Sequence, residues 1–202
     1  MSEDEDVRIG VYVCRCGVNI AGVLDTTEES GLTKFAKSLP HVVDAVENIS
    51  YCTTSGAEVI KESIKEHDIN RVVIAACTPK THEPVFQAVL EESGLRPTYL
   101  EFCNIREHVS LVHMKEPEKA QKKAEELIRG AVGRAYFLED IPEKTFPVDQ
   151  KCLVIGGGVG GCQSALDLAK QGYEVYLVEK KPTIGGKMAK LDRTFPTDDC
   201  SI

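Results

Sequence analysis

The sequence predicts an α/β protein in two parts: an N-terminal domain built on a mostly parallel sheet, then the start of a Rossmann-type nucleotide-binding domain. Through residue 145, apolar runs of strand length alternate with helical segments, as in a parallel sheet with helices on both faces. A glycine-rich loop then follows the apolar run Cys152–Ile155 and opens a helical segment. The next apolar run ends at Glu179, which completes the order of a dinucleotide-binding βαβ unit.

Bulk composition excludes several classes of protein. A chain of 202 residues with 42% hydrophobic and 28% charged residues suits one or two globular domains. The formal net charge of −8 argues against a nucleic-acid partner. No apolar run approaches the ~20 residues of a membrane span, and no secretory signal is visible, so we expect a cytoplasmic protein. Eight cysteines in such a chain favour metal or redox chemistry over disulfides.

The period of the apolar residues places the N-terminal elements. Arg71–Ala76 is almost uniformly apolar, as in a strand buried on both faces, and Ala57–His67 carries an apolar stripe at helical spacing. The expected strands are Val7–Val13, Val42–Ile49, Arg71–Ala76 and Pro97–Phe102. The expected helices are Thr27–Leu39, Ala57–His67, His82–Glu92, Ile105–Met114 and Glu116–Leu138. Pro142–Asp149 is typical of a linker, so we expect domains at residues 1–145 and 146–202.

Cysteines recur at the ends of the expected strands. Those that follow a strand are Cys14, Cys16, Cys52, Cys77 and Cys103. The carboxyl ends of parallel strands share one edge, so these thiols could converge there and hold an iron–sulfur cluster or zinc. Their wide spacing matches neither bacterial ferredoxins nor paired zinc knuckles. The alternative is that they are small buried thiols that pack as hydrophobic residues.

The glycine-rich loop has the G-x-G-x-x-G spacing at Gly156, Gly158 and Gly161. The first glycine permits a tight turn, the second lets the backbone approach a pyrophosphate, and the third lets the helix Cys162–Lys170 lie close to the strand. Glu179 ends the strand-like run that follows this helix and can accept hydrogen bonds from ribose hydroxyls. The alternative is a glycine-rich turn in an unrelated α/β domain, which leaves this glutamate unexplained.

Seven segments resemble the iron–sulfur flavoprotein of heterodisulfide reductase, the flavin-bearing subunit of that enzyme in methanogenic archaea and their relatives. They lie in the family's order along nearly the whole chain: Val11–Gly17, Ile74–Phe86, Asn104–His108, Val154–Gly161, Leu177–Lys180, Ile184–Ala189 and Leu191–Ile202. The motifs CTP-x-THEP and TFPTDDCSI are specific, since generic nucleotide-binding folds do not carry them. The sequence is therefore similar to the N-terminal portion of that family.

The resemblance implies a [4Fe–4S] cluster in the N-terminal domain. Its ligands by position are Cys14, Cys16, Cys52 and Cys77. Many members have a cysteine where Val109 stands here, and this departure makes Cys103 a reserve ligand. Cys200 matches the first cysteine of a second cluster motif and is also expected to bind metal.

The resemblance also implies a thioredoxin-reductase-like FAD domain from residue 146 onward. The residues that match the adenosine and pyrophosphate side of the FAD site are Gly156, Gly158, Gly161, Glu179 and Lys180. A second loop matches the part of the family that passes near the flavin, with residues Gly185, Gly186, Lys187 and Met188. No catalytic triad or pair of catalytic carboxylates is visible, so we expect no catalytic residue beyond the cofactor sites.

The implied function is electron transfer in methanogenesis. FAD would receive an electron pair from a hydrogenase or formate dehydrogenase, and would send one electron to the subunits that reduce the heterodisulfide CoM-S-S-CoB and the other to ferredoxin. The first alternative is a non-catalytic scaffold or assembly fragment of that complex. The second is a pyridine-nucleotide disulfide oxidoreductase, which needs a closely spaced redox cysteine pair beside the flavin.

The family's second cluster motif has its next cysteine at the position after Ile202. We expect that position to be a stop codon read as selenocysteine, so that the sequence is a truncated selenoprotein translation. The rival explanation is a split gene. The nucleotide sequence after codon 202 decides between the two.

Overall fold

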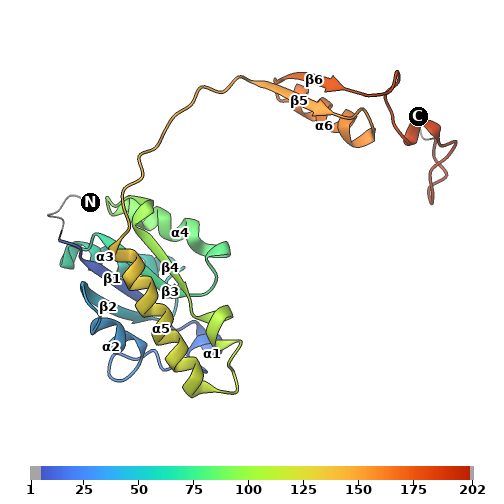
Figure 1. The fold of residues 1–202 in the computed structure, drawn as a ribbon. Helices are drawn as coiled ribbons and strands as arrows, with labels where there is room; N and C mark the ends of the chain where they lie inside the picture. The colour runs from blue at the N-terminus through green and yellow to red at the C-terminus, as the bar shows by residue number, and fades with distance from the viewer. Residues whose placement is uncertain (1–5, 201–202) are drawn as a thin grey trace. The chain divides into compact units, whose positions relative to one another are not determined.

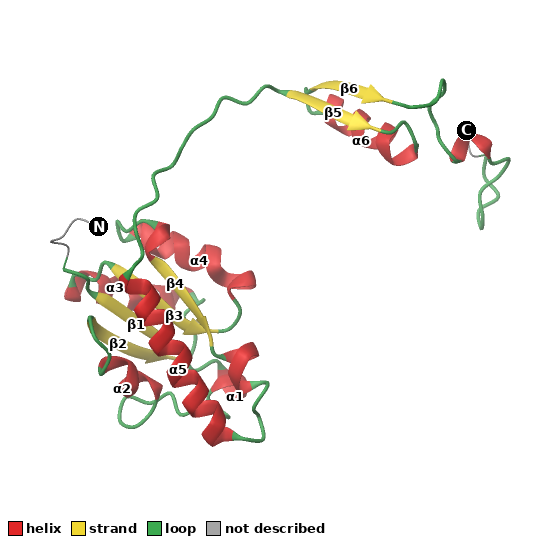
Figure 2. Cartoon of the chain, viewed as in Figure 1, coloured by secondary structure: helices red, strands yellow, loops and turns green. Residues whose placement is uncertain are grey.

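The computed structural model describes residues 6–200, and the chain divides into two compact units, Met1–Pro142 and Glu143–Ile202 (Figure 1). The N-terminal unit holds a four-stranded, all-parallel sheet in the order β2-β1-β3-β4 (Figure 2). Its strands are β1 (Ile9–Cys14), β2 (Val42–Asn48), β3 (Arg71–Ala76) and β4 (Leu100–Asn104). All residues of β1 and β3 are buried, as befits central strands, and the predicted α/β class is confirmed.

Helices pack on this sheet in two pairs. α2 and α5 contact each other as well as β1, and α3 and α4 form the second contacting pair (Figure 1). The helices of this unit are α1 (Gly17–Ile20), α2 (Leu32–Lys37), α3 (Thr54–His67), α4 (Pro79–Glu92) and α5 (Pro117–Tyr136). No helix among residues 6–200 combines the length and apolar character that crossing a bilayer requires.

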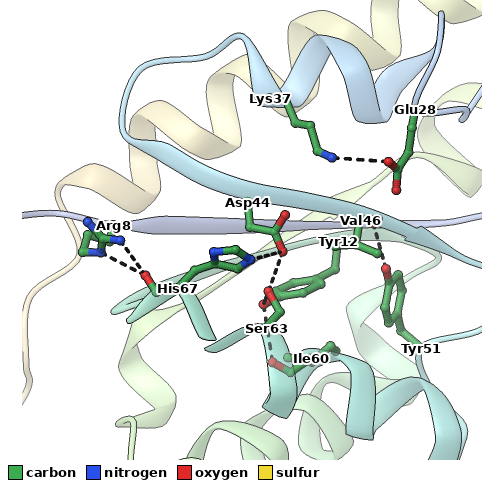
Figure 3. A network of polar contacts seen from close by, with 10 residues as sticks. All are labelled: Arg8, Tyr12, Glu28, Lys37, Asp44, Val46, Tyr51, Ile60, Ser63 and His67. Atoms are coloured by element: carbon green, nitrogen blue, oxygen red, sulfur yellow. Dashed lines mark hydrogen bonds and ion pairs between the residues drawn. The ribbon is translucent and has the colours of Figure 1, made fainter. Parts of the chain in front are cut away.

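A buried polar network joins the sheet to α3 (Figure 3). The hydroxyl of the fully buried Tyr12 donates to Ser63 Oγ at 3.0 Å, and Ser63 donates to Asp44 Oδ2 at 2.6 Å. The ring of Tyr12 also lies edge-on to that of Tyr51, with centroids 5.6 Å apart. Because each buried hydroxyl has a partner, the network fixes α3 on the sheet without leaving polar groups unsatisfied.

The helix expected at Thr27–Leu39 is much shorter in the structure, where α2 covers only Leu32–Lys37. The side chain of Asp25 accepts hydrogen bonds from Thr27 N at 3.0 Å and from Ser30 Oγ at 2.7 Å. Such local side-chain bonds compete with helix formation, so residues 28–30 form a turn instead of the start of the helix.

The region after α4 also differs from the expectation. Pro97–Tyr99 is a 3₁₀ turn, so strand β4 begins at Leu100 and ends at Asn104. The helix expected at Ile105–Met114 is only a π-helical turn, Arg106–Ser110. A proline at the first position of the 3₁₀ turn delays the strand because its fixed φ suits the turn.

The C-terminal unit contains a parallel pair, β5 (Lys151–Ile155) and β6 (Glu174–Val178), joined by α6 (Val159–Lys170). A 3₁₀ turn, Met188–Lys190, follows the second strand. Strand, helix and strand occur in the order that the sequence predicts for a Rossmann-like start.

Candidate functional site

The carboxyl ends of the four N-terminal strands are level with one another. Cys14, the last residue of β1, pairs with Asn48 of β2, and Ala76, the last residue of β3, pairs with Asn104 of β4. In the sheet, β2 lies beside β1 on one side and β3 lies beside β1 on the other side. The strand order therefore reverses direction at β1, and the switch point of the sheet lies between β1 and β3. Ligands of open α/β sheets bind at such switch points.

Four cysteines lie along this edge, which we call the thiol edge: Cys14, Cys16, Cys52 and Cys77. Cys14 is 6% exposed, and its Sγ lies 3.7 Å from the carbonyl oxygen of Ile49. Cys16 and Cys77 are half-buried, whereas Cys52 is exposed, with its Sγ 3.2 Å from Ser50 Oγ. The sequence expectation that thiols follow the strands holds for three of them, while Cys14 is the final residue of its strand.

The thiols of this edge interact electrostatically. Burial raises the pKa of Cys14, the backbone N–H groups of Cys16 and Tyr51 oppose that rise, and Cys16 and Cys52 add to it. Burial also raises the pKa of Cys77, to which the charge of Cys14 contributes. Cys14 thus interacts with each of the other three thiols. Among residues 6–200, however, no three cysteine, histidine or acidic side chains lie in a metal-holding arrangement.

Cys103 does not follow its strand, contrary to the expectation. It lies within β4, is 5% exposed, and burial raises its pKa to about 12. The sequence placed the end of this strand at Phe102, and the 3₁₀ turn before β4 shifts the strand toward the carboxyl end. Val109, where the resemblance implies a cysteine, is fully buried in the core.

The turn after β4 holds a charged pair, Arg106 and Glu107. Arg106 Nε and Nη2 donate to Glu107 Oε1 at 2.9 and 2.7 Å. The side chain of Asn104 accepts from the backbone N–H groups of both residues, at 3.1 and 2.9 Å. Sequence reasoning missed this asparagine, although an asparagine before a helical turn is a known capping signal.

The glycine-rich loop has steric reasons for two of its glycines. A Cβ at Gly161 would lie 1.8 Å from the carbonyl oxygen of Gly156, so only glycine allows this approach of α6 to β5. Gly156 has a φ of +104°, in the region that favours glycine. Gly158 precedes α6, whose first-turn N–H groups are available to a phosphate.

Glu179 follows β6 and faces the same loop. Its Oε2 accepts from the backbone N–H of Gly157 at 2.6 Å, and its Oε1 accepts from that of Lys181 at 2.9 Å. The hydrogen bond from Lys181, followed by that from Gly157, lowers the pKa of this carboxyl. The carboxylate is therefore charged beside the loop. Gly157 occupies a variable position of the G-x-G-x-x-G motif, so the motif itself does not predict its hydrogen bond to Glu179. The sequence feature that could have indicated this role is the run of three glycines, Gly156–Gly158.

The loop with Gly185 and Gly186 packs on the glycine-rich loop. The backbone N–H of Gly185 donates to the carbonyl of Gly157 at 2.6 Å, and a Cβ at Gly186 would lie 3.0 Å from Gly158 Cα. The remaining predicted residues are Lys180 and Lys187, both exposed, and Met188, half-buried at the start of a 3₁₀ turn. Cys200 is exposed and apart from the thiol edge in sequence, and the last residues of its motif, Ser201 and Ile202, lie outside the described residues.

A family profile described as FAD dependent oxidoreductase matches residues 151–195. This segment contains the glycine-rich loop, Glu179 and the loop with Gly185 and Gly186. The match supports FAD as the nucleotide at this site.

Curated relatives match the whole of this chain. A CoB–CoM heterodisulfide reductase iron-sulfur subunit of Methanopyrus kandleri is 57% identical over 202 residues, which cover 100% of this chain and 30% of the relative. The iron-sulfur subunit of the same name from Methanocaldococcus jannaschii is 57% identical over 195 residues, 96% of this chain and 29% of the relative. An H₂/formate:CoB-CoM heterodisulfide,ferredoxin reductase subunit of Methanococcus maripaludis is 51% identical over 197 residues, 98% of this chain and 30% of the relative.

The chain thus spans under a third of the length of these relatives. Its N-terminal unit and its glycine-rich loop both fall inside the matched region, so the match does not rest on the nucleotide fold alone. The resemblance is confirmed: over its whole length, this chain is homologous to the N-terminal portion of the iron–sulfur flavoprotein of heterodisulfide reductase.

Proposed function

We propose that the protein is the FAD and iron–sulfur electron-transfer subunit of a heterodisulfide reductase complex. The observation that carries this proposal is the 57% identity across the entire chain, including the thiol edge. The complex would reduce CoM-S-S-CoB and, by electron bifurcation at the flavin, also reduce ferredoxin. Its partners would be the other reductase subunits, a hydrogenase or formate dehydrogenase as electron donor, and ferredoxin. A thiol-rich chain of this kind suits the reducing cytoplasm.

The thiol edge fits an iron–sulfur cluster by its donor chemistry. Cys14, Cys16, Cys52 and Cys77 would supply four thiolates, the ligand set of a [4Fe–4S] cluster, and a bound cluster would act as a one-electron relay. Burial raises the pKa of Cys14, and the backbone N–H groups of Cys16 and Tyr51 partly oppose this rise. Cys200 would serve a second cluster.

The glycine-rich loop fits the adenosine and pyrophosphate part of FAD. The first-turn N–H groups of α6 would bind the pyrophosphate, and Glu179 would accept from ribose hydroxyls through lone pairs that Gly157 and Lys181 leave free. Lys180 would lie beside the phosphates, and Gly186, Lys187 and Met188 would border the flavin. The protein's contribution is the placement of the cofactors and the tuning of their potentials.

The test is the cofactor content of the complete polypeptide, purified with its complex without oxygen. We expect iron, acid-labile sulfide and FAD, with charge-transfer absorbance beneath the flavin bands. Colourless protein would overturn the proposal and favour the scaffold alternative. Reduction of a disulfide by NADPH with the polypeptide alone would favour the disulfide oxidoreductase alternative, although the described cysteines beside the glycine-rich loop, Cys152 and Cys162, are not closely spaced.

A further inference from the structure

A hollow of about 440 Å³ lies between the last turns of α5 and the chain segment that joins α2 to β2. Its volume falls in the range of roughly 300–1,000 Å³ that is typical of small-molecule sites. The joining segment contributes His41, which directly precedes β2, so the hollow is at the amino end of this strand, whereas the thiol edge is at the carboxyl ends. α5 contributes four residues whose helical spacing places them on one face: Arg129, Val132, Gly133 and Tyr136.

Aromatic rings form one wall of this hollow. The ring of His41 lies on that of Tyr136, with centroids 4.6 Å apart and planes 38° apart, and Phe137 meets the same tyrosine edge-on at 5.0 Å. The carbonyl of His41 accepts the backbone N–H of Ile9 at 2.8 Å, which ties the histidine to the first residue of β1. Its φ of +64° lies in the left-handed region, and non-glycine residues in that region cluster at ligand sites.

A helical glycine keeps the hollow open. Only proline is less favourable than glycine inside a helix, so a glycine within α5 needs a reason. A Cβ at Gly133 would meet no heavy atom within 4 Å, and therefore no close contact among residues 6–200 requires glycine there. Gly133 does line the hollow, where any larger side chain would take up the space.

The charge of the hollow is positive. Arg129 lines it, and no carboxylate does. The guanidinium carbon of Arg129 lies 5.3 Å from the ring centroid of Phe35, and this arginine makes no ion pair within the described residues 6–200. In a chain with a formal net charge of −8, an arginine without a carboxylate partner at an aromatic wall is suited to an anion brought by a ligand.

We propose that this hollow binds a small planar aromatic anion. The ring of the ligand packs against His41 and Tyr136, and its carboxylate or phosphate accepts hydrogen bonds from Arg129. The inference goes beyond the proposed function, because the hollow contains no residue of the thiol edge or of the glycine-rich loop. It therefore stands or falls independently of the cofactors assigned to those two sites.

The experiment is equilibrium dialysis of the complete polypeptide in its complex, prepared without oxygen, with 1-naphthoate as the probe. Neutral 1-naphthalenemethanol tests the need for charge, and cyclohexanecarboxylate tests the need for an aromatic ring. We expect the wild type to bind one more equivalent of 1-naphthoate than Gly133→Leu, whose side chain fills the hollow. Gly130→Leu is the matched control, because Gly130 is in the same helix, a Cβ there also meets no heavy atom within 4 Å, and it does not line the hollow.

The arginine separates charge from shape. Arg129→Gln should weaken binding of 1-naphthoate about tenfold, as expected for the loss of a charged hydrogen bond, whereas Arg129→Lys should stay closer to the wild type. Both the alcohol and the non-aromatic acid should bind more weakly than 1-naphthoate.

Equal binding by wild type and Gly133→Leu, or an equal loss in Gly130→Leu, would overturn the inference. Binding of the neutral alcohol as tight as that of 1-naphthoate would also overturn it. Iron and FAD content should be the same in wild type and Gly133→Leu. If Gly133→Leu loses its cofactors or fails to fold, the two Arg129 variants decide: weaker binding in Arg129→Gln alone supports the site, and unchanged binding in Arg129→Gln overturns it.

Discussion

Glu179 Oε2 accepts a hydrogen bond of 2.6 Å from the backbone N–H of Gly157, and thereby joins the end of β6 to the glycine-rich loop. The carbonyl of the same glycine accepts from the backbone N–H of Gly185 at 2.6 Å. Three segments that are separate in sequence thus form one hydrogen-bonded unit before any nucleotide binds. Preorganisation of this kind reduces the ordering that binding requires.

Replacing Glu179 should weaken flavin retention. Glu179→Ala removes the acceptor for Gly157 and Lys181, and Glu179→Gln removes the charge but keeps one acceptor, so the alanine variant should lose more FAD. The measurement is FAD per polypeptide after gel filtration of the complete protein. Glu174→Gln, an exposed carboxylate at the start of β6, is the control and should retain flavin. Equal retention in Glu179→Ala and the control would contradict the assigned role.

Gly161→Ala should disrupt the loop. Its new Cβ would lie 1.8 Å from the carbonyl oxygen of Gly156, and backbone must shift to relieve the overlap, at a cost of about 1–3 kcal/mol or more. Gly133→Ala is the control because Gly133 lies in helix α5, away from the glycine-rich loop in sequence, and a Cβ there would meet no neighbouring atom within 4 Å. We expect loss of FAD from the first variant only, measured by flavin fluorescence after denaturation. Loss from both would show that the steric argument is wrong.

Glu101 should make stability depend on pH. Burial raises its pKa above the usual 4.5, although Arg134, at 3.1 Å, opposes the rise. A raised pKa means that the folded state binds the proton more tightly than the unfolded state. Protonated Glu101 therefore stabilises the folded state, and this contribution to the free energy of unfolding is complete below about pH 4.5. It is lost as the pH rises through the pKa that Glu101 has in the folded state.

Glu101→Gln should remove that loss. Urea unfolding of wild type and variant from pH 4 upward measures it, and the free energy of unfolding of the wild type should fall relative to the variant as pH rises. Arg134→Gln should steepen the fall, because the charged carboxylate then loses its partner. A constant difference between wild type and Glu101→Gln across this range would refute the prediction.

Cys103 should be an inert thiol. With a pKa of about 12, it carries roughly four orders of magnitude less thiolate than thiol at pH 8, and it is 5% exposed. In iron-free, reduced protein, iodoacetamide should label the exposed Cys52 rapidly and label Cys103 only after unfolding. Mass spectrometry of the labelled peptides provides the rates. Comparable rates for the two cysteines would return Cys103 to the list of ligand candidates.

Much of the fold could be predicted because it follows from local periodicity. The uniformly apolar Arg71–Ala76 is β3 with the same bounds, and the order of strand, glycine loop, helix and strand locates β5, α6 and β6. The short helix α2 could not be predicted this way, because the hydrogen bonds of Asp25 to Thr27 and Ser30 replace the first helical turns and leave no mark on the apolar pattern.

The position of the thiols at the ends of the strands could be predicted from the sequence, whereas the contacts of the neighbouring residues could not. Because several cysteines follow expected strands, the topology of a parallel sheet predicts the thiol edge. Cys103 was expected to follow its strand as well, but β4 ends at Asn104, so Cys103 lies inside the strand and not after it. The pairing of Arg106 with Glu107, and the cap from Asn104, are short-range geometries that several turn types would have allowed. A sequence motif names such residues without stating what they contact.

The most direct test of the central claim is the iron content of four variants, Cys14→Ala, Cys16→Ala, Cys52→Ala and Cys77→Ala, beside Cys103→Ala, in the complete polypeptide prepared without oxygen. The thiol edge predicts a loss of about four iron atoms per polypeptide in each of the four variants and no loss in Cys103→Ala. Unchanged iron in any of the four, or an equal loss in Cys103→Ala, would contradict it.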